Sequence, residues 1–512
     1  VRPMRRVSIA SASQLAADAR GYVADAGGTP VDAAIGAAIC SMVTDPGILA
    51  PGAGGFVTVW PSAGAPVVID AYAEMPGRGL PSERFGKGGR DIIMTYGGAT
   101  RTIVGYGSVA TPGAFAGLSL AWERYGAMPW AELFGPAISA VENGFPLSSA
   151  AAEYLGHSHD LVFGWDPPSY DVIHHANGRH LSAGDPVLIP HLADSLRQLA
   201  EEGVGALYGG DLGARIAAGV EGHDGVLTLR DLVEYEAIVR TPITVDVDDW
   251  SIATNPAPAV GGATMAAMLL LMGIKGFDKW EAPDVARLVE VQSAVLTYRR
   301  SHLDELHDRS SEAVRLLELA SVGDLSALLS APSTAHTSTV DSDGLGCSVT
   351  VSAGYGSGAM VEGTGMWLNN SLGEMELHPG GFHGVTPGSR LVSNMAPTVA
   401  RSRHGAVLAV GSPGADRITT AMSSVLVNFI HLGMSLSDSI DHARLHTEIF
   451  DGTPTVSYEP GIDVSGVSGF DLRRFPDLSM YFGGVQASLW DPLAGFFEYA
   501  DSRRSGGVAH GG

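Results

Sequence analysis

The chain has 512 residues, of which 45% are hydrophobic, and its 55 acidic and 31 basic side chains give a formal net charge of −24. This hydrophobic content can fill a large core, so the chain is not intrinsically disordered, although it contains 67 glycines and 29 prolines. No cluster of basic residues interleaved with aromatic residues occurs in the sequence, and nucleic acid is therefore not an expected partner.

The first half of the chain alternates predicted helices with predicted strands. Apolar residues recur at helical spacing in some segments and alternate with polar residues in others. The predicted elements are a helix over 30–43, strands over 56–60 and 67–71, several helices over 112–147, a helical hairpin over 148–199, a short helix over 227–235 capped by Thr228, a strand over 243–252, a buried helix within 257–274 and a long helix over 285–309.

Residues 321–337 are rich in Ser, Ala and Thr and have the composition of a linker between two domains. After them the predicted elements are strands over 337–340, 347–352, 366–369, 406–410, 455–458 and 485–490 and helices over 419–432 and 436–442. Because helices and hairpins are predicted on both sides of residue 334, we expect one layered α+β body rather than two separate domains.

Neither the cysteines nor the chain ends indicate a secreted or membrane protein. Cys40 and Cys347 show no CxxC spacing, so we expect two buried thiols without a disulfide framework or zinc site. Residues 1–16 lack the apolar core of a secretory signal, and the apolar run 257–274 is interrupted by proline and glycine. These features favour a cytoplasmic location without a membrane span, provided that the sequence has not been trimmed.

The segment 333–352 contains a candidate N-terminal nucleophile. A threonine whose α-amine has been freed by chain cleavage can act as a nucleophile, because that amine serves as its base. The unperturbed pKa of the amine, about 7.7 to 8.0, leaves part of it neutral near physiological pH. Before cleavage the same hydroxyl can attack the preceding carbonyl, and water then opens the ester. By contrast, an isolated threonine is ordinarily part of an ST turn or a polar edge strand.

This segment, STAHTSTVDSDGLGCSVTVS, resembles the processing site of the γ-glutamyltranspeptidase family. In that family the nucleophilic threonine is followed by a Thr-His-aromatic-Ser stretch, a hydrophobic pair and Asp-x-Asp-Gly. Thr334 stands in the nucleophile's place. Other segments resemble the family in the same order and spacing: GGTPVDAAIGAA, PGAGGFVTVW, GSVATPGAFAGLSLAWERYGAMPW, LYGGDLGARIA, DLVEYEAIVRTPI, PAPAVGG, GSGAMVEGTGMWLNN, RLVSNMAPT and GSPGADRI.

The resemblance implies a fold and a maturation step. The implied fold is the four-layer αββα sandwich of N-terminal-nucleophile hydrolases. It also implies self-cleavage between Ser333 and Thr334, with residues 1–333 as the large-subunit segment and residues 334–512 as the small-subunit segment of one composite domain. The two fragments would form a heterodimer, and a further dimer of heterodimers stays open.

The resemblance also implies roles for residues at matching positions. Ser352 corresponds to the hydroxyl residue that supports the nucleophile, and Gly414 and Ala415 correspond to the paired glycines whose backbone N–H groups form the oxyanion hole. Ser393 and Asn394 replace the two serines that contact the substrate carboxylate. Finally, Glu374 falls where the family places the aspartate that holds the substrate α-amine.

Two departures from the family concern the substrate pocket. The family's arginine for the γ-glutamyl α-carboxylate lies in an Asp-Phe-Arg-Glu stretch, whereas this chain reads Asp-Ala-Tyr-Ala-Glu over 70–74, with Tyr72 near the arginine's position. Tyrosine cannot supply the charge of a bidentate guanidinium, and Arg78 is the nearest candidate to replace it. The loop SAGYGSG, 352–358, is also two residues shorter than the family's substrate loop and lacks its Asn-Thr pair.

We therefore expect a Thr-nucleophile hydrolase or acyltransferase that acts through an acyl-enzyme on a γ-glutamyl or altered amide-like small molecule, without a cofactor. His378 and His383 lack a third ligand at suitable spacing, so no metal is expected. One alternative is a homologue in bacterial secondary metabolism, such as antibiotic biosynthesis of the 4-alkylproline type, that hydrolyses a carbon-carbon bond of a keto-acid-bearing intermediate. Another is a non-catalytic processed homologue, against which the intact Thr334, Ser352 and GSPGA loop argue.

Overall fold

The computed structural model describes residues 6–95, 100–274, 277–304, 308–323, 335–378, 380–414, 416–449 and 454–511. Ser333, Thr334 and Ala415 therefore lie outside the described residues. Within the described ranges, no helix combines the length and the hydropathy needed to cross a membrane.

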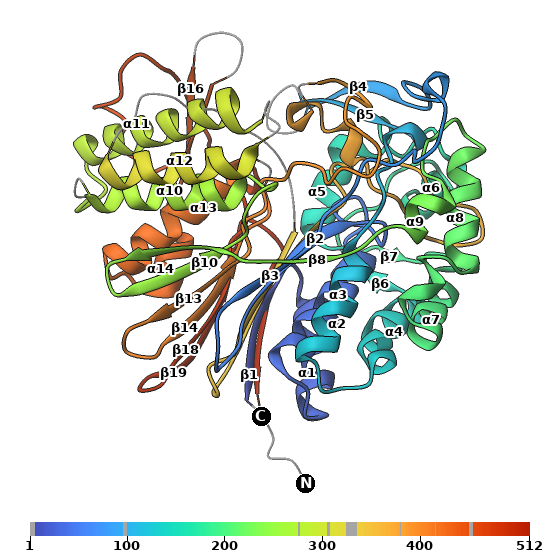
Figure 1. The fold of residues 1–512 in the computed structure, drawn as a ribbon, viewed down its shortest axis with the longest axis horizontal. Helices are drawn as coiled ribbons and strands as arrows, with labels where there is room; N and C mark the ends of the chain where they lie inside the picture. Colours follow the sequence, from blue (N-terminus) through green and yellow to red (C-terminus); the bar gives the residue numbers. More distant parts are fainter. Residues whose placement is uncertain are drawn as a thin grey trace.

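Two antiparallel sheets form the centre of the structure (Figure 1). The seven-stranded sheet has the order β20 (Gly507–Gly511), β1 (Val7–Ser11), β11 (Ala335–Asp341), β12 (Gly346–Ser352), β2 (Gly54–Trp60), β3 (Val67–Ala71) and β8 (Ile238–Arg240). The six-stranded sheet has the order β19 (Gly495–Ala500), β18 (Gln486–Asp491), β14 (Val407–Gly411), β13 (Thr398–Ser402), β10 (Trp250–Thr254) and β9 (Ile243–Val247). Strand β11 packs on β14 and β18, so the sheets are stacked face to face.

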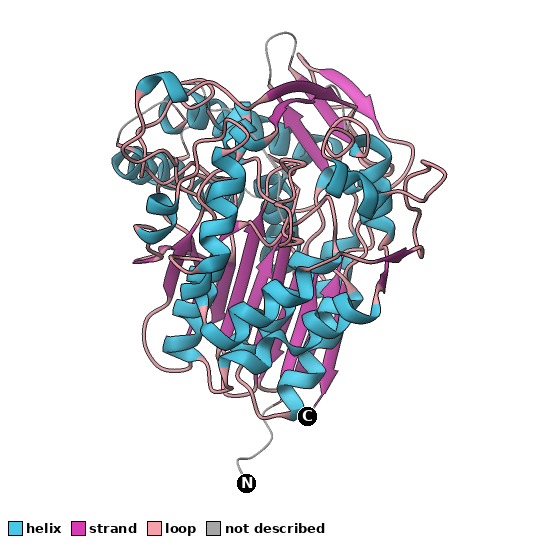
Figure 2. Cartoon of the chain, turned by 90° about the vertical axis from the view of Figure 1, so that its right-hand side faces the viewer, coloured by secondary structure: helices cyan, strands magenta, loops and turns pink. Residues whose placement is uncertain are grey.

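Helices cover the outer face of each sheet, which gives the four layers of an αββα sandwich (Figure 1). On the side of the seven-stranded sheet, seen from the front in Figure 2, are α1 (Gln14–Asp25), α2 (Pro30–Thr44), α3 (Ala114–Tyr125), α4 (Gly135–Asn143), α5 (Ser149–Ser158), α6 (Pro167–Ile173), α7 (Leu192–Glu202), α8 (Asp211–Glu221) and α9 (Leu229–Val233). On the opposite side are α10 (Gly261–Ile274), α11 (Ala282–Tyr298), α12 (Arg309–Val322), α13 (Arg417–Leu426) and α14 (Leu436–Asp441). The predicted αββα architecture is confirmed.

Three small sheets lie outside the sandwich. They are β15 (Leu445–Glu448) with β16 (Thr455–Tyr458) and β17 (Asp471–Arg474), β4 (Arg90–Met94) with β5 (Thr100–Val104), and β6 (Phe145–Pro146) with β7 (Pro186–Val187).

Helix α2 shows how the sequence builds the layer that supports β11. Thr29 caps the helix, and its side chain and that of Asp32 bond each other's backbone N–H in a capping box. Pro30 occupies the first turn, where its missing N–H costs nothing. Because its residues are small or apolar and all buried, α2 packs closely on β1, β11 and β12. The helix predicted over 30–43 is thus confirmed, as is Thr228 as the cap of α9.

Some predicted elements are wrong in extent. The segment 243–252 is a hairpin of β9 and β10 rather than one strand, because Asp248, at φ 49°, and Asp249 form a tight polar turn. The long helix predicted over 285–309 starts earlier, with Pro283 in its first turn, and passes after Tyr298 into a short π-helix over Arg299–Leu303.

Two other predictions are also wrong. The helical hairpin predicted over 148–199 consists of α5, α6 and α7, and β7 between α6 and α7 pairs with β6. The strand predicted over 366–369 forms only isolated bridges, because Asn369 uses its side chain to bond the backbone of Gly52 and Ala110. The backbone groups of Gly52 and Ala110, which a regular strand over 366–369 could have bonded, therefore already have partners.

Candidate active site

The candidate site lies where β11 begins and β12 ends. Ala335, the first residue of β11, pairs with Val351 of β12, and Ser352 is the next residue on β12. The Ser352 hydroxyl accepts a hydrogen bond from the Gly354 N–H at 3.0 Å and is buried. The predicted nucleophile Thr334 lies outside the described residues, so the site is described from its neighbours.

Glu374 packs against the turn that follows Ser352. Gly354 adopts φ +64°, and a Cβ at this position would lie 2.3 Å from the Asn370 Oδ1 and 3.2 Å from the Glu374 Oε1. Only glycine therefore allows the turn to approach the carboxyl so closely. Asn370 also accepts a hydrogen bond from the Tyr355 N–H at 2.7 Å, which fixes the turn on the other side.

Tyr72 also contacts Glu374. It follows the last residue of β3, and its ring stacks on Phe56 with centroids 5.8 Å apart. Its hydroxyl donates a hydrogen bond to the Glu374 Oε1 at 3.4 Å. The structure thus brings together Ser352, Glu374 and Tyr72, which are 22 or more residues apart in the sequence.

Ser393 and Asn394 lie in an irregular segment beside the same cluster. The Ser393 hydroxyl accepts from the Met395 N–H at 3.2 Å, and the Ser393 carbonyl accepts from the Val260 N–H at 2.8 Å. Met395 belongs to the apolar cluster that contains Tyr72. Both predicted residues are 2% exposed, and this segment packs on the start of α10 so closely that a Cβ on Gly261 would lie 1.9 Å from the Asn394 carbonyl oxygen.

The GSPGA loop follows β14. Gly414 has φ +134°, and a Cβ there would lie 2.5 Å from the Gly483 Cα, so this position requires glycine. Ala415 lies outside the described residues. Asp416 comes next and forms ion pairs with Arg417 and with His446, whose Nε2 is 3.2 Å from the carboxylate. Burial alone would raise the pKa of Asp416, but the Arg417 and His446 charges outweigh it and hold this pKa below its usual value.

His336 connects β11 to the start of this loop. Its Nδ1 lies 2.8 Å from the Thr350 Oγ1 and its Nε2 2.7 Å from the Ser338 Oγ. Burial lowers the pKa of the ring to about 3, so the imidazole is neutral. The ring also fills the space over Gly411, where an added Cβ would lie 2.2 Å from it. The sequence motif contains His336 but does not reveal this bridge between the sheets.

A second carboxyl accompanies Glu374, and the sequence reasoning missed it. Glu376 accepts a hydrogen bond from the Tyr355 hydroxyl at 3.0 Å. Burial raises the pKa of Glu376 to about 7, and burial together with the Glu376 charge raises the pKa of Glu374 well above its usual value. The spacing of the two glutamates in GEMEL was the available signal, but it did not show that both turn toward the tyrosines.

Two arginines near Tyr72 bond protein groups: Arg390 bonds the Tyr72 backbone, and Arg78 bonds neighbouring carboxylates. Arg390 donates to the Tyr72 carbonyl at 2.6 Å, and the Tyr235 hydroxyl donates to the same oxygen at 2.8 Å. Arg78, the predicted substitute for the family's arginine, forms ion pairs with the carboxylates of Glu74, Asp231 and Glu234 at 2.7, 3.4 and 3.3 Å. Its charge is therefore already compensated by the protein.

The two loop histidines bond backbone groups. His378 places its Nε2 2.7 Å from the Ser371 carbonyl, and His383 places its Nε2 2.7 Å from the Gly107 carbonyl. Across the described ranges, no group of three or more His, Cys, Asp or Glu side chains is arranged to hold a metal ion.

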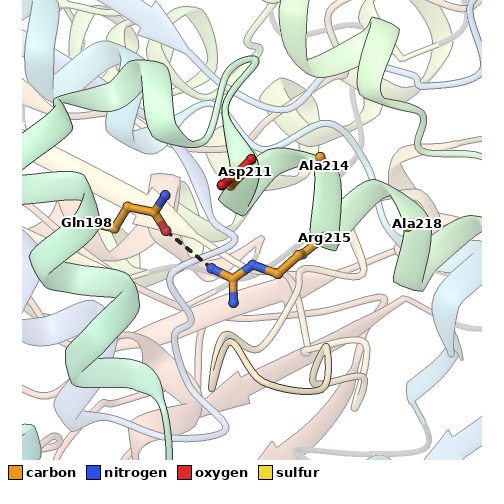
Figure 3. Close-up of a pocket in the computed structure, with 5 residues that line it drawn as sticks. All are labelled: Gln198, Asp211, Ala214, Arg215 and Ala218. Atoms are coloured by element: carbon orange, nitrogen blue, oxygen red, sulfur yellow. Dashed lines mark hydrogen bonds between the residues drawn. The ribbon is translucent and has the colours of Figure 1, made fainter.

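A surface hollow lies on helices α7 and α8 (Figure 3). Arg215 there donates a hydrogen bond to the Gln198 Oε1 at 3.2 Å, and Asp211, Ala214 and Ala218 complete the lining. None of the predicted site residues contributes to it, so it is separate from the candidate active site.

Comparison with known proteins identifies the family. The chain matches the family profile described as Gamma-glutamyltranspeptidase over residues 16–511. It belongs to the gamma-glutamyltranspeptidase family. It is 26% identical to a glutathione hydrolase proenzyme of Pseudomonas aeruginosa, over 98% of this chain and 94% of that protein. It is also 28% identical to the acylase ACY 1 proenzyme of Pseudomonas sp. strain SE83, over 85% of this chain and 81% of that protein.

The fold is shared with a solved acylase. The crystal structure of cephalosporin acylase from Bacillus halodurans superposes with a TM-score of 0.83 at 24% identity, covering 99% of this chain and 96% of that one. The chain is therefore an enzyme of the gamma-glutamyltranspeptidase-like N-terminal-nucleophile hydrolase and transferase class, as the sequence motifs predicted.

Proposed function

We propose that this chain is a proenzyme that cuts itself between Ser333 and Thr334, after which Thr334 hydrolyses or transfers the acyl group of a small amide-like substrate. The observation that carries the proposal is that β11 begins beside Ser352 and the Glu374–Tyr72 contact. Thr334 is the residue bonded to Ala335, the first residue of β11.

The same hydroxyl performs both reactions. In maturation the Thr334 oxygen attacks the Ser333 carbonyl carbon, the peptide C–N bond breaks as the ester forms, and water hydrolyses the ester to free the α-amine. In turnover the α-amine takes the hydroxyl proton during attack on the substrate carbonyl and passes it to the leaving amine. Water or an acceptor amine then releases the acyl group. The N–H groups of Gly414 and Ala415 would stabilise the negative oxygen, and the Ser352 hydroxyl would support the nucleophile.

After the cut the two fragments would remain one body. The seven-stranded sheet takes β1, β2, β3 and β8 from residues 1–333 and β11, β12 and β20 from residues 334–512. The six-stranded sheet likewise combines β9 and β10 with four strands of the second segment. Separating the fragments would break both sheets, so we infer a heterodimer, in keeping with relatives that are named proenzymes.

The substrate we propose is an amide other than the ordinary γ-glutamyl donors. Tyr72 stands near the family's arginine position, and Arg78 is engaged by three carboxylates. Losing a charged anchor for a buried carboxylate typically removes about 2 to 5 kcal/mol of binding. Hydrolysis of a carbon-carbon bond, which the sequence analysis considered, stays an alternative. The mass of an acyl adduct trapped on Thr334 would distinguish it from amide hydrolysis.

The test is maturation followed by turnover. Mass spectrometry of the purified wild type should show fragments 1–333 and 334–512, the smaller beginning Thr-Ala-His. Thr334→Ala should remain a single chain without activity, Ser352→Ala should fold but cleave and turn over more slowly, and Ser333→Ala, which keeps the Thr334 hydroxyl, should still cleave. A wild type that is fully active as one 512-residue chain would overturn the proposal.

A further inference from the structure

The loop between β14 and α13 has a buried carboxylate at its end. Asp416 immediately precedes α13, and the Arg417 N–H donates to the Gly414 carbonyl at 3.1 Å, so one turn joins Asp416 to the proposed oxyanion donor. An aspartate at the start of a helix ordinarily caps it, but the Asp416 side chain makes no capping bond. Its carboxylate pairs instead with Arg417 and with His446.

His446, on β15, contacts the start of α13 at two points. Its Nε2 lies 3.2 Å from the Asp416 Oδ2, and its Nδ1 lies 3.1 Å from the Oγ1 of Thr420, one turn farther along the helix. The ring is fully buried. Its strand is itself fixed, because the Gln292 side chain of α11 accepts from the Thr447 N–H at 3.0 Å. His446 therefore joins the end of the loop to a rigid part of the fold.

Arg417 holds the loop from the other side. Its Nε donates to the Tyr481 carbonyl at 2.9 Å, and its guanidinium lies 4.5 Å from the centroid of the Tyr481 ring. Gly483, two residues later, packs against Gly414, where an added Cβ would lie 2.5 Å from the Gly483 Cα. The loop is thus held between residues 481–483 and β15, and the Asp416 carboxylate connects the two supports.

Stability alone does not account for such an arrangement. A buried ion pair often adds no more stability than apolar side chains of similar volume, because both charges lose their water. What charged hydrogen bonds add is a defined geometry. An oxyanion donor depends on this geometry, since its N–H must point at the negative oxygen of the transition state, and a displacement of about 1 Å can slow a reaction about 100-fold.

We propose that Asp416 is a positioning residue for acyl transfer: its bonds to His446 and Arg417 hold the Gly414 N–H where the negative oxygen forms. Asp416 acts through the loop and not on the substrate. This inference rests on the proposed function, because it takes Gly414 as an oxyanion donor. It goes beyond that function in assigning the support of the oxyanion loop to a charged pair between the start of α13 and β15.

Hydrolysis of p-nitrophenyl acetate tests this role without knowledge of the natural substrate. This small activated ester needs a nucleophile and a stabilised oxyanion but no particular acyl pocket. Release of p-nitrophenolate is corrected for the release by Thr334→Ala, and kcat is expressed per cleaved chain, counted by intact mass. We expect Asp416→Ala to lower kcat about tenfold or more while KM stays within about twofold, because the oxyanion exists only in the transition state.

Conservative variants and a matched control separate positioning from general stability. Asp416→Asn keeps an acceptor oxygen and should recover part of kcat, and His446→Gln, which keeps an N–H near the position of Nε2, should be faster than His446→Leu. Adding His446→Leu to Asp416→Ala should cost little more, since the link is already absent. Asp32→Asn makes the same change at another fully buried aspartate, in α2 of the other helical layer, and should lower Tm but leave kcat unchanged.

The outcomes separate this inference from the function on which it rests. Wild-type kcat in the Asp416 variants, a loss confined to KM, or an equal loss of kcat in Asp32→Asn would overturn the inference alone. If Asp416→Ala does not fold, Asp416→Asn and the two His446 variants decide by the same criteria. A wild type that does not cleave itself, or that releases no more p-nitrophenolate than Thr334→Ala, would overturn the proposed function, and the inference with it.

Discussion

Replacing Gly411 with alanine would push a methyl group into the His336 ring. The new Cβ would lie 2.2 Å from the Cε1, 2.3 Å from the Nδ1 and 2.6 Å from the Nε2 of that ring. Because carbon atoms in van der Waals contact are about 3.5 to 4.0 Å apart, either the ring or the end of β14 must move by about 1 Å. The ring cannot move freely, since Thr350 and Ser338 hold its two nitrogens.

The expected loss of stability in Gly411→Ala follows from these contacts. Overpacking a dense interior typically costs about 1 to 3 kcal/mol, and a buried ring nitrogen that loses its partner adds about 1 to 3 kcal/mol. We expect Gly411→Ala to lower the free energy of unfolding by about 2 to 5 kcal/mol in total. If β14 moves instead, the shift passes to Gly414, and misplacing this proposed oxyanion donor would slow acyl chemistry by about 100-fold or more.

Thermal unfolding and a time course of fragment formation by mass spectrometry measure the two effects. Gly156→Ala is the matched control, because this exposed glycine of α5 has open space at its Cβ and helical alanine is favourable. Adding Gly411→Ala to His336→Ala should cost less than adding it to the wild type, since the ring is then absent. Wild-type stability and cleavage rate in Gly411→Ala would refute this account of the loop.

Tyr72→Arg should raise kcat/KM on γ-glutamyl p-nitroanilide at least about tenfold relative to Tyr72→Phe. The reason is that the new guanidinium and the substrate carboxylate, about 4 Å apart, would attract by about 4 kcal/mol at an effective dielectric constant of 20. An unchanged kcat/KM would contradict this prediction. A pH prediction concerns Glu376, whose pKa burial raises from 4.5 to about 7. The folded chain holds this proton more tightly than the unfolded chain, so the free energy of unfolding falls as pH rises through that range. In thermal unfolding between about pH 5 and 8, Glu376→Gln should reduce this fall by up to about 3 kcal/mol. An equally steep profile in the variant would contradict this. The ionisable groups around Glu376 are Glu374, Tyr72, Tyr355, Asp416 and Arg417.

Much of the architecture could be predicted from the sequence because local patterns determine it. Strands β3 and β16 have the predicted bounds, and α2 starts at the predicted residue, because alternation and a proline-led capping box are local signals. Chain reversals inside an apolar pattern were harder to predict. Two consecutive aspartates, Asp248 and Asp249, are the only sign of the hairpin in the sequence, and after them the alternation of apolar residues resumes shifted by one position, at Trp250.

The sequence could place a candidate site residue only where one motif specifies one residue, and the roles of these residues stay predictions. Ser352, Glu374 and Tyr72 each occupy a recognisable place in the family pattern, and the structure brings them together. The roles of Glu376 and His336 depend on partners from other segments. Glu376 needs Tyr355 from the shortened loop, and His336 needs Gly411 from the second sheet, 75 residues away. Spacing along the chain does not show such contacts.

Strand β11 begins within the segment 321–337, whose composition resembles a linker, and yet it lies at the centre of the fold. All residues of AHTSTVD are buried, but most of them are polar. Thr337 bonds the Ser11 hydroxyl at 2.7 Å, Ser338 donates to the Gln486 carbonyl at 3.1 Å, and Thr339 donates to the Pro30 carbonyl at 2.9 Å. These bonds tie the strand to its neighbour in the sheet, to the second sheet and to α2. Apolar side chains would tolerate small shifts, whereas directed hydrogen bonds hold the strand in one position, as the proposed nucleophile Thr334, which is bonded to Ala335, would require.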